Sequence, residues 1–186
     1  ASPIMTDTKK GGWSGPARGL MIAAMDATSE TILKRLEDLG IASQTHTHVP
    51  VFTVEESQAH CSHLPGGHCK NLFLKDKKGA LWLVVTLDER PINMKELRHK
   101  IGAHHLSFGK PDLLRDVLGV EPGSVTPFAL INDNEHQVRV VLDKEMMAMD
   151  LLNYHPLINT MTTAISPNDL LTFIRDTGHE PDLVEL

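Results

Sequence analysis

Two apolar runs separated by a short polar turn constrain the fold of this chain more than any other feature. The runs extend from Asn71 to Lys75 and from Leu81 to Thr86, and Asp76-Lys77-Lys78-Gly79 lies between them. A short polar segment that ends in glycine between two such runs is typical of a β-hairpin. Because both runs are rich in aliphatic residues, we expect the hairpin to be buried.

Helix signals surround this hairpin. Apolar residues recur at helical spacing from Ile32 to Leu39, and Gly40 provides a stop. Further helix starts are predicted by the capping boxes Thr53-Val54-Glu55-Glu56 and Asn93-Met94-Lys95-Glu96, by Pro111 ahead of Leu118 and Gly119, and by Ser166-Pro167, whose helix ends at Gly178.

Other segments predict additional strands. Thr45 to His48 alternates in the manner of a short exposed strand, and Phe128 to Ile131 and Val138 to Leu142 predict a second hairpin across Asn132 to Glu135. Interleaved hairpins and helices favour an α+β fold, with a mixed, mostly antiparallel sheet wrapped by helices in a single domain. We place this domain at residues 28–186 and expect residues 1–27 to be a floppy leader that is partly an expression remnant.

Composition excludes several functional classes. The chain has 186 residues, 41% apolar and 23% charged, with a formal net charge of −6, which argues against a protein coated by a broad basic surface. Local basic clusters remain, at Lys70 to Lys78 and at Arg98 to Lys110. Two cysteines are too few for a disulfide framework, and no apolar run is long enough to span a membrane, so we expect a cytoplasmic protein.

Histidine and cysteine residues between His60 and Cys69 raise the alternatives of a zinc site or a thiol nucleophile. His60-Cys61-Ser62-His63 and His68-Cys69 contain suitable ligand types, but the spacing lacks a second matching pair. Cys69 has no identified histidine or carboxylate partner for nucleophilic chemistry. A polar loop without metal is the favoured interpretation.

Three separate segments carry better candidates. Lys70 follows two glycines at the start of the first apolar run, where a cation can bind phosphate or stabilise a developing negative charge, and Asn71 offers a donor and an acceptor beside it. Gly123-Ser124-Val125-Thr126-Pro127 can form a tight turn that presents backbone N–H groups to a ligand, and His155 lies between Tyr154 and Pro156. Taken alone, each has an ordinary structural explanation.

Together these segments resemble the YbaK/ProX family of trans-acting aminoacyl-tRNA editing domains, in particular the prolyl-tRNA editing proteins. The resemblance covers about residues 30–183. It is carried by Val51 to Glu56, Pro65 to Asp76, Leu106 to Gly109, Leu118 to Pro127, Leu130 to Asp133 and Tyr154-His155-Pro156.

The resemblance implies hydrolysis of alanine from mischarged tRNA(Pro) in a small pocket at the centre of a sheet. It implies catalytic roles for Lys70, Gly123 and His155, and substrate binding by Asn71 and by Ser124, Val125, Thr126 and Pro127. No metal and no cofactor is expected. The implied partner is the acceptor end of tRNA(Pro) charged with alanine, and prolyl-tRNA synthetase and an elongation factor are candidate partners.

Two alternatives stay open on the sequence. The same fold could remove another small residue, cysteine or serine, because the size of a pocket is not readable from sequence. A non-catalytic module that binds tRNA or a protein would also retain the fold.

Overall fold

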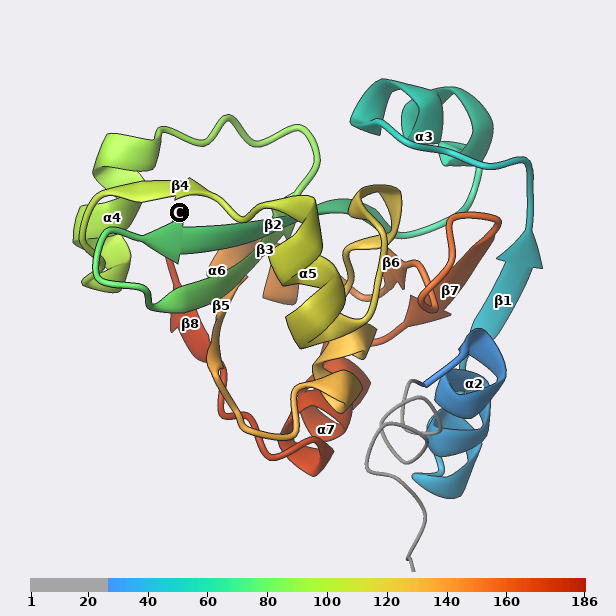
Figure 1. Cartoon of the computed structure of the whole chain (residues 1–186). Coiled ribbons are helices and arrows are strands. Elements are labelled where there is room, and N and C mark those ends of the chain that lie inside the picture. The colour runs from blue at the N-terminus through green and yellow to red at the C-terminus, as the bar shows by residue number, and fades with distance from the viewer. Residues whose placement is uncertain (1–26) are drawn as a thin grey trace, which may run out of the picture.

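The computed structural model describes residues 27–186, and its strands form one eight-stranded sheet with helices on both faces (Figure 1). The helices are α2 (Ser29–Asp38), α3 (Val54–Cys61), α4 (Met94–Ile101), α5 (Pro111–Leu118), α6 (Lys144–Met147) and α7 (Pro167–Asp176), with 3₁₀ turns η1 (Pro122–Ser124) and η2 (Pro127–Asn132). The strands are β1 (Gln44–Thr47), β2 (Gly67–Asp76), β3 (Leu81–Leu87), β4 (Leu106–Phe108), β5 (Val138–Asp143), β6 (Leu152–Tyr154), β7 (Met161–Ile165) and β8 (Asp182–Val184).

The strand order is β1-β7-β6-β2-β3-β5-β8, and β4 also pairs with β2. Four pairings are antiparallel, namely β1 with β7, β7 with β6, β2 with β3, and β2 with β4. Three are parallel, namely β2 with β6, β3 with β5, and β5 with β8. The predicted α+β fold with a mixed sheet is therefore confirmed.

The edge of β2 opposite β3 is only partly covered. Its first residues, Gly67 and His68, pair with β6, whereas Leu74 to Asp76 pair with β4. Within residues 27–186, no strand covers the intervening residues 69–73 on that side, although the Gly109 N–H donates to the carbonyl of Phe73 at 2.9 Å. This gap places Lys70 and Asn71 at an open edge in the middle of the sheet.

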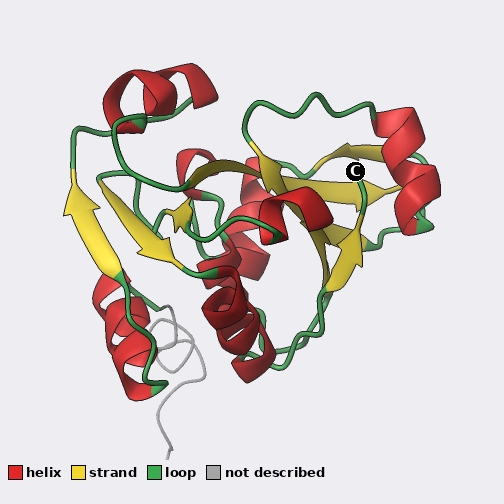
Figure 2. Cartoon of the chain, turned by 180° about the vertical axis from the view of Figure 1, so that it is seen from behind, coloured by secondary structure: helices red, strands yellow, loops and turns green. Residues whose placement is uncertain are grey.

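Alternating side chains divide the core between the two faces of the sheet. Leu83, Val85 and Phe73 pack with α2, α5, α7 and η2 on one face, whereas Trp82 and Val84 pack with α4 on the other. The view from behind shows the helices on either side of the yellow strands (Figure 2). Few aromatic residues enter this core, in which aliphatic side chains predominate.

Local signals placed most helices correctly. Thr28, Thr53, Asn93 and Ser166 each accept a backbone N–H at the start of their helix. Helix α5 begins at Pro111 and ends before Gly119, as predicted. These predictions succeed because a cap acts within one turn of its own helix.

The predicted second hairpin is wrong. Residues 127–132 form η2 rather than a strand, because Pro127 occupies its first turn and the Thr126 side chain accepts the N–H of Phe128 at 3.3 Å. Strand β5 instead pairs in parallel with β3, which is far away in the sequence. The predicted domain limits are not tested, and the predicted leader at residues 1–27 falls almost entirely outside the described residues.

Candidate functional site

The open edge of β2 presents Lys70 at a small cavity beside α3 and η1. The Lys70 Nζ donates to the main-chain carbonyl of Arg90, which follows β3. An ammonium group has three donors, so two remain for a ligand. Lys70 is half-buried and lines the cavity.

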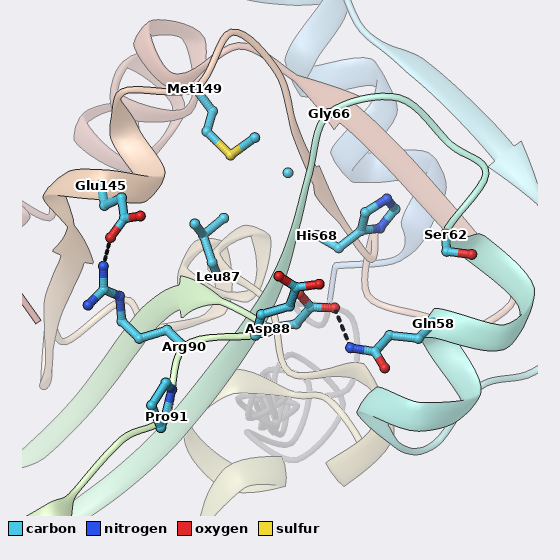
Figure 3. A pocket seen from close by; sticks show the side chains of 12 residues that line it. Gln58, Ser62, Gly66, His68, Leu87, Asp88, Arg90, Pro91, Glu145 and Met149 are labelled. Carbon is cyan, nitrogen blue, oxygen red and sulfur yellow. Dashed lines mark hydrogen bonds and ion pairs between the residues drawn. The ribbon is translucent and has the colours of Figure 1, made fainter.

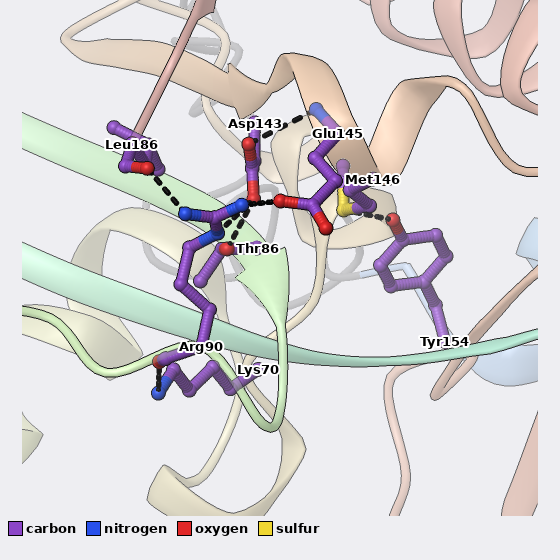
Figure 4. Close-up of polar contacts among 8 residues, drawn as sticks. All are labelled: Lys70, Thr86, Arg90, Asp143, Glu145, Met146, Tyr154 and Leu186. Carbon is purple, nitrogen blue, oxygen red and sulfur yellow. Dashed lines mark hydrogen bonds and ion pairs between the residues drawn. The ribbon is translucent and has the colours of Figure 1, made fainter.

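Arg90 is itself fixed by several contacts (Figure 4). Its Nε lies 2.8 Å from Oδ2 of the buried Asp143, its guanidinium also pairs with Glu145, and it donates to the carbonyl of Leu186. The buried hydroxyl of Thr86 donates to Asp143 Oδ2 at 2.7 Å. This network holds the peptide carbonyl that anchors the Lys70 ammonium.

Asn71 contributes an unused acceptor to the same cavity. Its Oδ1 is buried and has no hydrogen-bond partner among the described residues. Buried polar atoms are nearly always paired, so an orphan acceptor in a cavity indicates a place for a donor from a ligand.

The turn at η1 forms another wall. Gly123 and Val125 line the cavity, and a Cβ at Gly123 would lie 3.2 Å from Cδ1 of Phe52. Ser124, Thr126 and Pro127, also predicted to bind substrate, are buried and do not line the cavity. Thr126 caps η2, which holds the turn in place.

His155 completes the cavity from the end of β6. Its Nδ1 lies 2.8 Å from the carbonyl of Met161, and since a carbonyl only accepts, Nδ1 carries the proton and Nε2 is an acceptor. Burial lowers the pKa of His155, helped by the neighbouring His48, and outweighs the hydrogen bond to Met161. The ring is therefore held neutral at ordinary pH.

Sequence reasoning assigned no role to several residues that line the cavity, including Phe52, Ser57 and Asp88. Phe52 precedes α3 and is 68% exposed, and Ser57 lies on α3. Asp88 follows β3 and accepts a hydrogen bond from Gln58 of α3 at 3.3 Å. Of these three residues, only Phe52 lies in a segment that carries the family resemblance, Val51 to Glu56, and its exposure is known only from the structure.

The cavity that contains Lys70, which we call the Lys70 cavity, has a volume of about 190 Å³. At about 30 Å³ for each water molecule, it holds roughly six waters. It is therefore smaller than the pockets of about 300–1,000 Å³ that enclose drug-sized ligands. Such a space suits one small side chain.

A larger cavity of about 690 Å³ adjoins the Lys70 cavity and shares Asp88 with it (Figure 3). The close-up shows Gln58 bonded to Asp88 on one side and Arg90 bonded to Glu145 on the other. This larger cavity is acidic, because Asp88, Glu89 and Glu145 line it and its arginine, Arg90, is already paired.

The cysteine and histidine residues between His60 and Cys69 were considered above as metal ligands or as a nucleophile. Burial raises the pKa of the Cys69 thiol to about 12, so it stays protonated, and the Cys61 pKa is also raised by burial. His68 Nε2 lies 3.0 Å from the Leu64 carbonyl. Between residues 27 and 186, no three His, Cys, Asp or Glu side chains are arranged to hold a metal ion. Over the same residues no helix is long and apolar enough to cross a membrane.

Comparison with known proteins gives consistent similarities. The pattern of the aminoacyl-tRNA editing domain matches residues 48–173. The chain is 41% identical to prolyl-tRNA synthetase associated domain-containing protein 1 of Danio rerio, over 89% of this chain and 90% of that one. It is 34% identical to prolyl-tRNA editing protein ProX of Acetoanaerobium sticklandii, over 87% and 99%. The crystal structure of hypothetical protein APE2540 has the same fold, with a TM-score of 0.65 at 18% identity, covering 82% of this chain and 97% of that one.

Proposed function

The chain belongs to the aminoacyl-tRNA editing domain family, and from this we propose that it is a trans-acting deacylase that hydrolyses alanine from mischarged tRNA(Pro). The observation that carries the proposal is the Lys70 cavity. It gathers Lys70, Asn71, Gly123, Val125 and His155 from three distant segments around one small space.

Ester hydrolysis suits these groups. An aminoacyl ester is already reactive, so an enzyme must chiefly position water and stabilise the oxyanion that develops on the carbonyl. In this proposal Lys70 supplies positive charge through its two free N–H donors, either to that oxyanion or to the phosphate of the terminal nucleotide. Backbone N–H groups of the Gly123 turn orient the ester carbonyl.

His155 and Asn71 are proposed to act as acceptors. The neutral imidazole presents Nε2 without a proton, so it can accept a hydrogen bond from the attacking water or from the substrate. Asn71 Oδ1 is available in the same way for the α-amino group of the amino acid. The terminal ribose hydroxyl of the substrate is a further group that can help to activate water.

Selectivity in this proposal is steric. A synthetase pocket separates small apolar amino acids poorly, so a second, smaller site removes those that the first admits. The 190 Å³ cavity, narrowed by Phe52 and Gly123, supports selection of alanine over proline. The terminal nucleoside would then lie outside it.

The direct test measures release of labelled amino acid from tRNA(Pro) charged with alanine, cysteine, serine or proline. We expect fastest release of alanine, none of proline above the rate in buffer, and strong loss of activity in Lys70→Ala. Alanine release no faster than in buffer would refute the proposal.

The same panel decides the alternatives. Faster release of cysteine or serine than of alanine would assign the same chemistry to another substrate. Binding of tRNA without release of any amino acid would indicate a non-catalytic module. A deacylase of this kind acts where aminoacyl-tRNA is made, so we also propose a cytoplasmic location, with prolyl-tRNA synthetase or an elongation factor as candidate partners.

A further inference from the structure

A groove with three lysines lies at the far end of β2 from Lys70. It has a volume of about 1,000 Å³ and is lined by Lys75, Asp76, Lys77, His105, Ser107, Phe108 and Lys110, and by Asp112, Leu113 and Asp116 of α5. The carboxylate of Asp76 is buried and accepts the backbone N–H groups of Lys78, Ala80 and His104, so the lysines are the exposed charges on the β2 side. We call it the β4–α5 groove. None of its three lysines forms an ion pair with any residue between 27 and 186, so their charges are available to a ligand.

Phe108 is an unusual feature of this groove. Within the described part of the chain, five of the seven aromatic residues are at most 4% exposed. The other two, Phe52 at 68% and Phe108 at 67%, are also the most exposed large apolar side chains. One borders the Lys70 cavity and the other borders the β4–α5 groove. Exposed aromatic rings beside free cations are the combination with which proteins bind nucleic-acid strands, by stacking on bases.

The groove and the Lys70 cavity lie along the same face and edge of β2. Phe73 packs in the core beneath α5, so Asn71 and Lys75, each two residues away, point to the same face. Helix α5 borders the groove, and the η1 turn that follows it borders the Lys70 cavity. In Figure 1, α5 begins near β2 and runs across the direction of that strand.

Distance along the strand links the two sites. Lys70 points to the face of β2 opposite to Lys75, whereas Asn71, which also lines the Lys70 cavity, points to the same face as Lys75. Asn71 and Lys75 are four residues apart, which is about 13 Å at roughly 3.3 Å for each residue. Stacked nucleotides in one strand are about 3.4 Å apart, so this span corresponds to about four nucleotides.

We propose that the β4–α5 groove binds the RNA strand that carries the ester, about four nucleotides from its esterified end. Phosphates contact Lys75, Lys77 and Lys110, and one base stacks on Phe108. This proposal rests on the proposed deacylase function and adds the surface that holds the RNA.

The acidic wall of the groove sets the orientation of the strand. Asp112 is paired with Arg115 at 3.0 Å, and Asp116 has no ion-pair partner among the described residues. These carboxylates repel phosphate, so the backbone lies toward β2 and β4.

The groove differs from the basic cluster that the sequence suggested. Of the basic residues and histidines from Arg98 to Lys110, His105 and Lys110 line the groove, together with Lys75 and Lys77 from the β2 end. Lys95 and Lys100 are exposed residues of α4 that do not line the groove, so their substitution provides a matched control.

The test compares Lys75→Ala/Lys110→Ala with Lys95→Ala/Lys100→Ala, which lose the same charge. Binding of an uncharged RNA minihelix bearing the acceptor strand is measured by fluorescence anisotropy at several salt concentrations. For the groove variant we expect the slope of log affinity against log salt to fall by about 1.4, at roughly 0.7 for each lost phosphate contact. The control variant should keep the wild-type slope. An unchanged slope in the groove variant, or an equal fall in the control, overturns the proposal.

Phe108→Leu tests the stacking separately, since it keeps an apolar side chain and removes the ring. We expect about fivefold weaker binding or more. Unchanged binding overturns the stacking role.

A short substrate separates the groove from the active site. Lys75→Ala/Lys110→Ala and Phe108→Leu should each lower kcat/KM on alanyl-tRNA(Pro). Both variants should keep the wild-type rate on 3′-alanyl-adenosine, because this substrate cannot reach the groove. Equal loss on both substrates would contradict the proposal. Failure of the wild type to hydrolyse either substrate would instead refute the proposed function, while the anisotropy measurement still decides the groove.

Discussion

The substitution Gly123→Ala tests whether the η1 turn borders the amino acid of the substrate. Gly123 does not have a positive φ, so an alanine is compatible with its backbone conformation. The new Cβ would lie 3.2 Å from Cδ1 of Phe52 and 3.5 Å from Nδ2 of Asn159. The first distance is short, so the Phe52 ring must shift by a few tenths of an ångström, which an exposed side chain can do.

Stability should change little. At a compatible position, replacing glycine with alanine stabilises a protein by about 0.4–1 kcal/mol, because the unfolded chain loses freedom. The crowding of Phe52 offsets part of this gain. We therefore expect a free energy of unfolding close to that of the wild type.

Activity should change much more. The extra methyl group adds volume at the wall of a cavity of about 190 Å³. One carbon too many in a selective pocket costs about 1–3 kcal/mol, or roughly 10–200-fold in kcat/KM. We expect a loss in this range for release of alanine from tRNA(Pro), measured in single-turnover reactions.

The double variant Gly123→Ala/Phe52→Ala is the matched test of this explanation. Removing the ring relieves the contact, so the double variant should recover part of the activity. Wild-type kcat/KM in Gly123→Ala would show that Gly123 does not border the substrate. A large fall in the thermal midpoint, or no recovery in the double variant, would equally contradict the reasoning.

Four further predictions concern charge and ionisation. Lys70→Ala should lower kcat by about 10²–10³-fold, the usual cost of losing one group that stabilises an oxyanion, with thermal unfolding as the control for folding. Because burial lowers the pKa of His155, deacylation should persist as pH falls through about 6.5 and be lost only below it, and a pH profile centred above 6.5 would contradict this. Burial opposes ionisation of Asp133, but hydrogen bonds from His179 and from two backbone N–H groups outweigh burial and lower the pKa of Asp133. The contribution of Asp133 to stability is therefore complete above about pH 4 and is lost as pH falls through the lowered pKa. Asp133→Asn should lower the free energy of unfolding by about 3–5 kcal/mol at pH 7. It should also weaken the dependence of that free energy on pH below about pH 4, measured by urea unfolding at several pH values. Since burial raises the pKa of Cys69 to about 12, the native thiol should resist alkylation by iodoacetamide at pH 8, and rapid modification would show that it is accessible and ionised.

Local sequence signals predicted the elements that depend on local interactions. The helix caps and the β2–β3 hairpin are each decided within a few residues, by a side chain that accepts a nearby N–H or by a turn that fixes the register. The strands β4, β6, β7 and β8 escaped prediction, and all of them except β7 have three residues. Such short strands exist only because distant partners pair with them, and no periodic pattern can develop over three residues.

The error at residues 128–131 has the same origin. A short apolar run does not distinguish a strand from a helical turn. Pro127 and the Thr126 cap favoured the turn, and β5 found its partner in β3, more than fifty positions earlier in the chain.

The candidate site, too, was predicted only in part from the sequence. The family resemblance implied Lys70, Asn71, Gly123, Val125 and His155, which line one cavity in the structure, but also Ser124, Thr126 and Pro127, which are buried outside it. It did not indicate Phe52, whose position over the cavity depends on how α3 packs against the η1 turn.

By itself the sequence determined the residue types, the capped helices and the central hairpin, since these depend on interactions within a few positions. Only the tertiary structure decided that β6 and β4 cover the two ends of β2 and leave its middle open. That gap brings Lys70 against the η1 turn and His155, and it sets the β4–α5 groove on the same edge. Its cause is long-range strand pairing, in which each hydrogen bond depends on a partner that the local sequence does not specify.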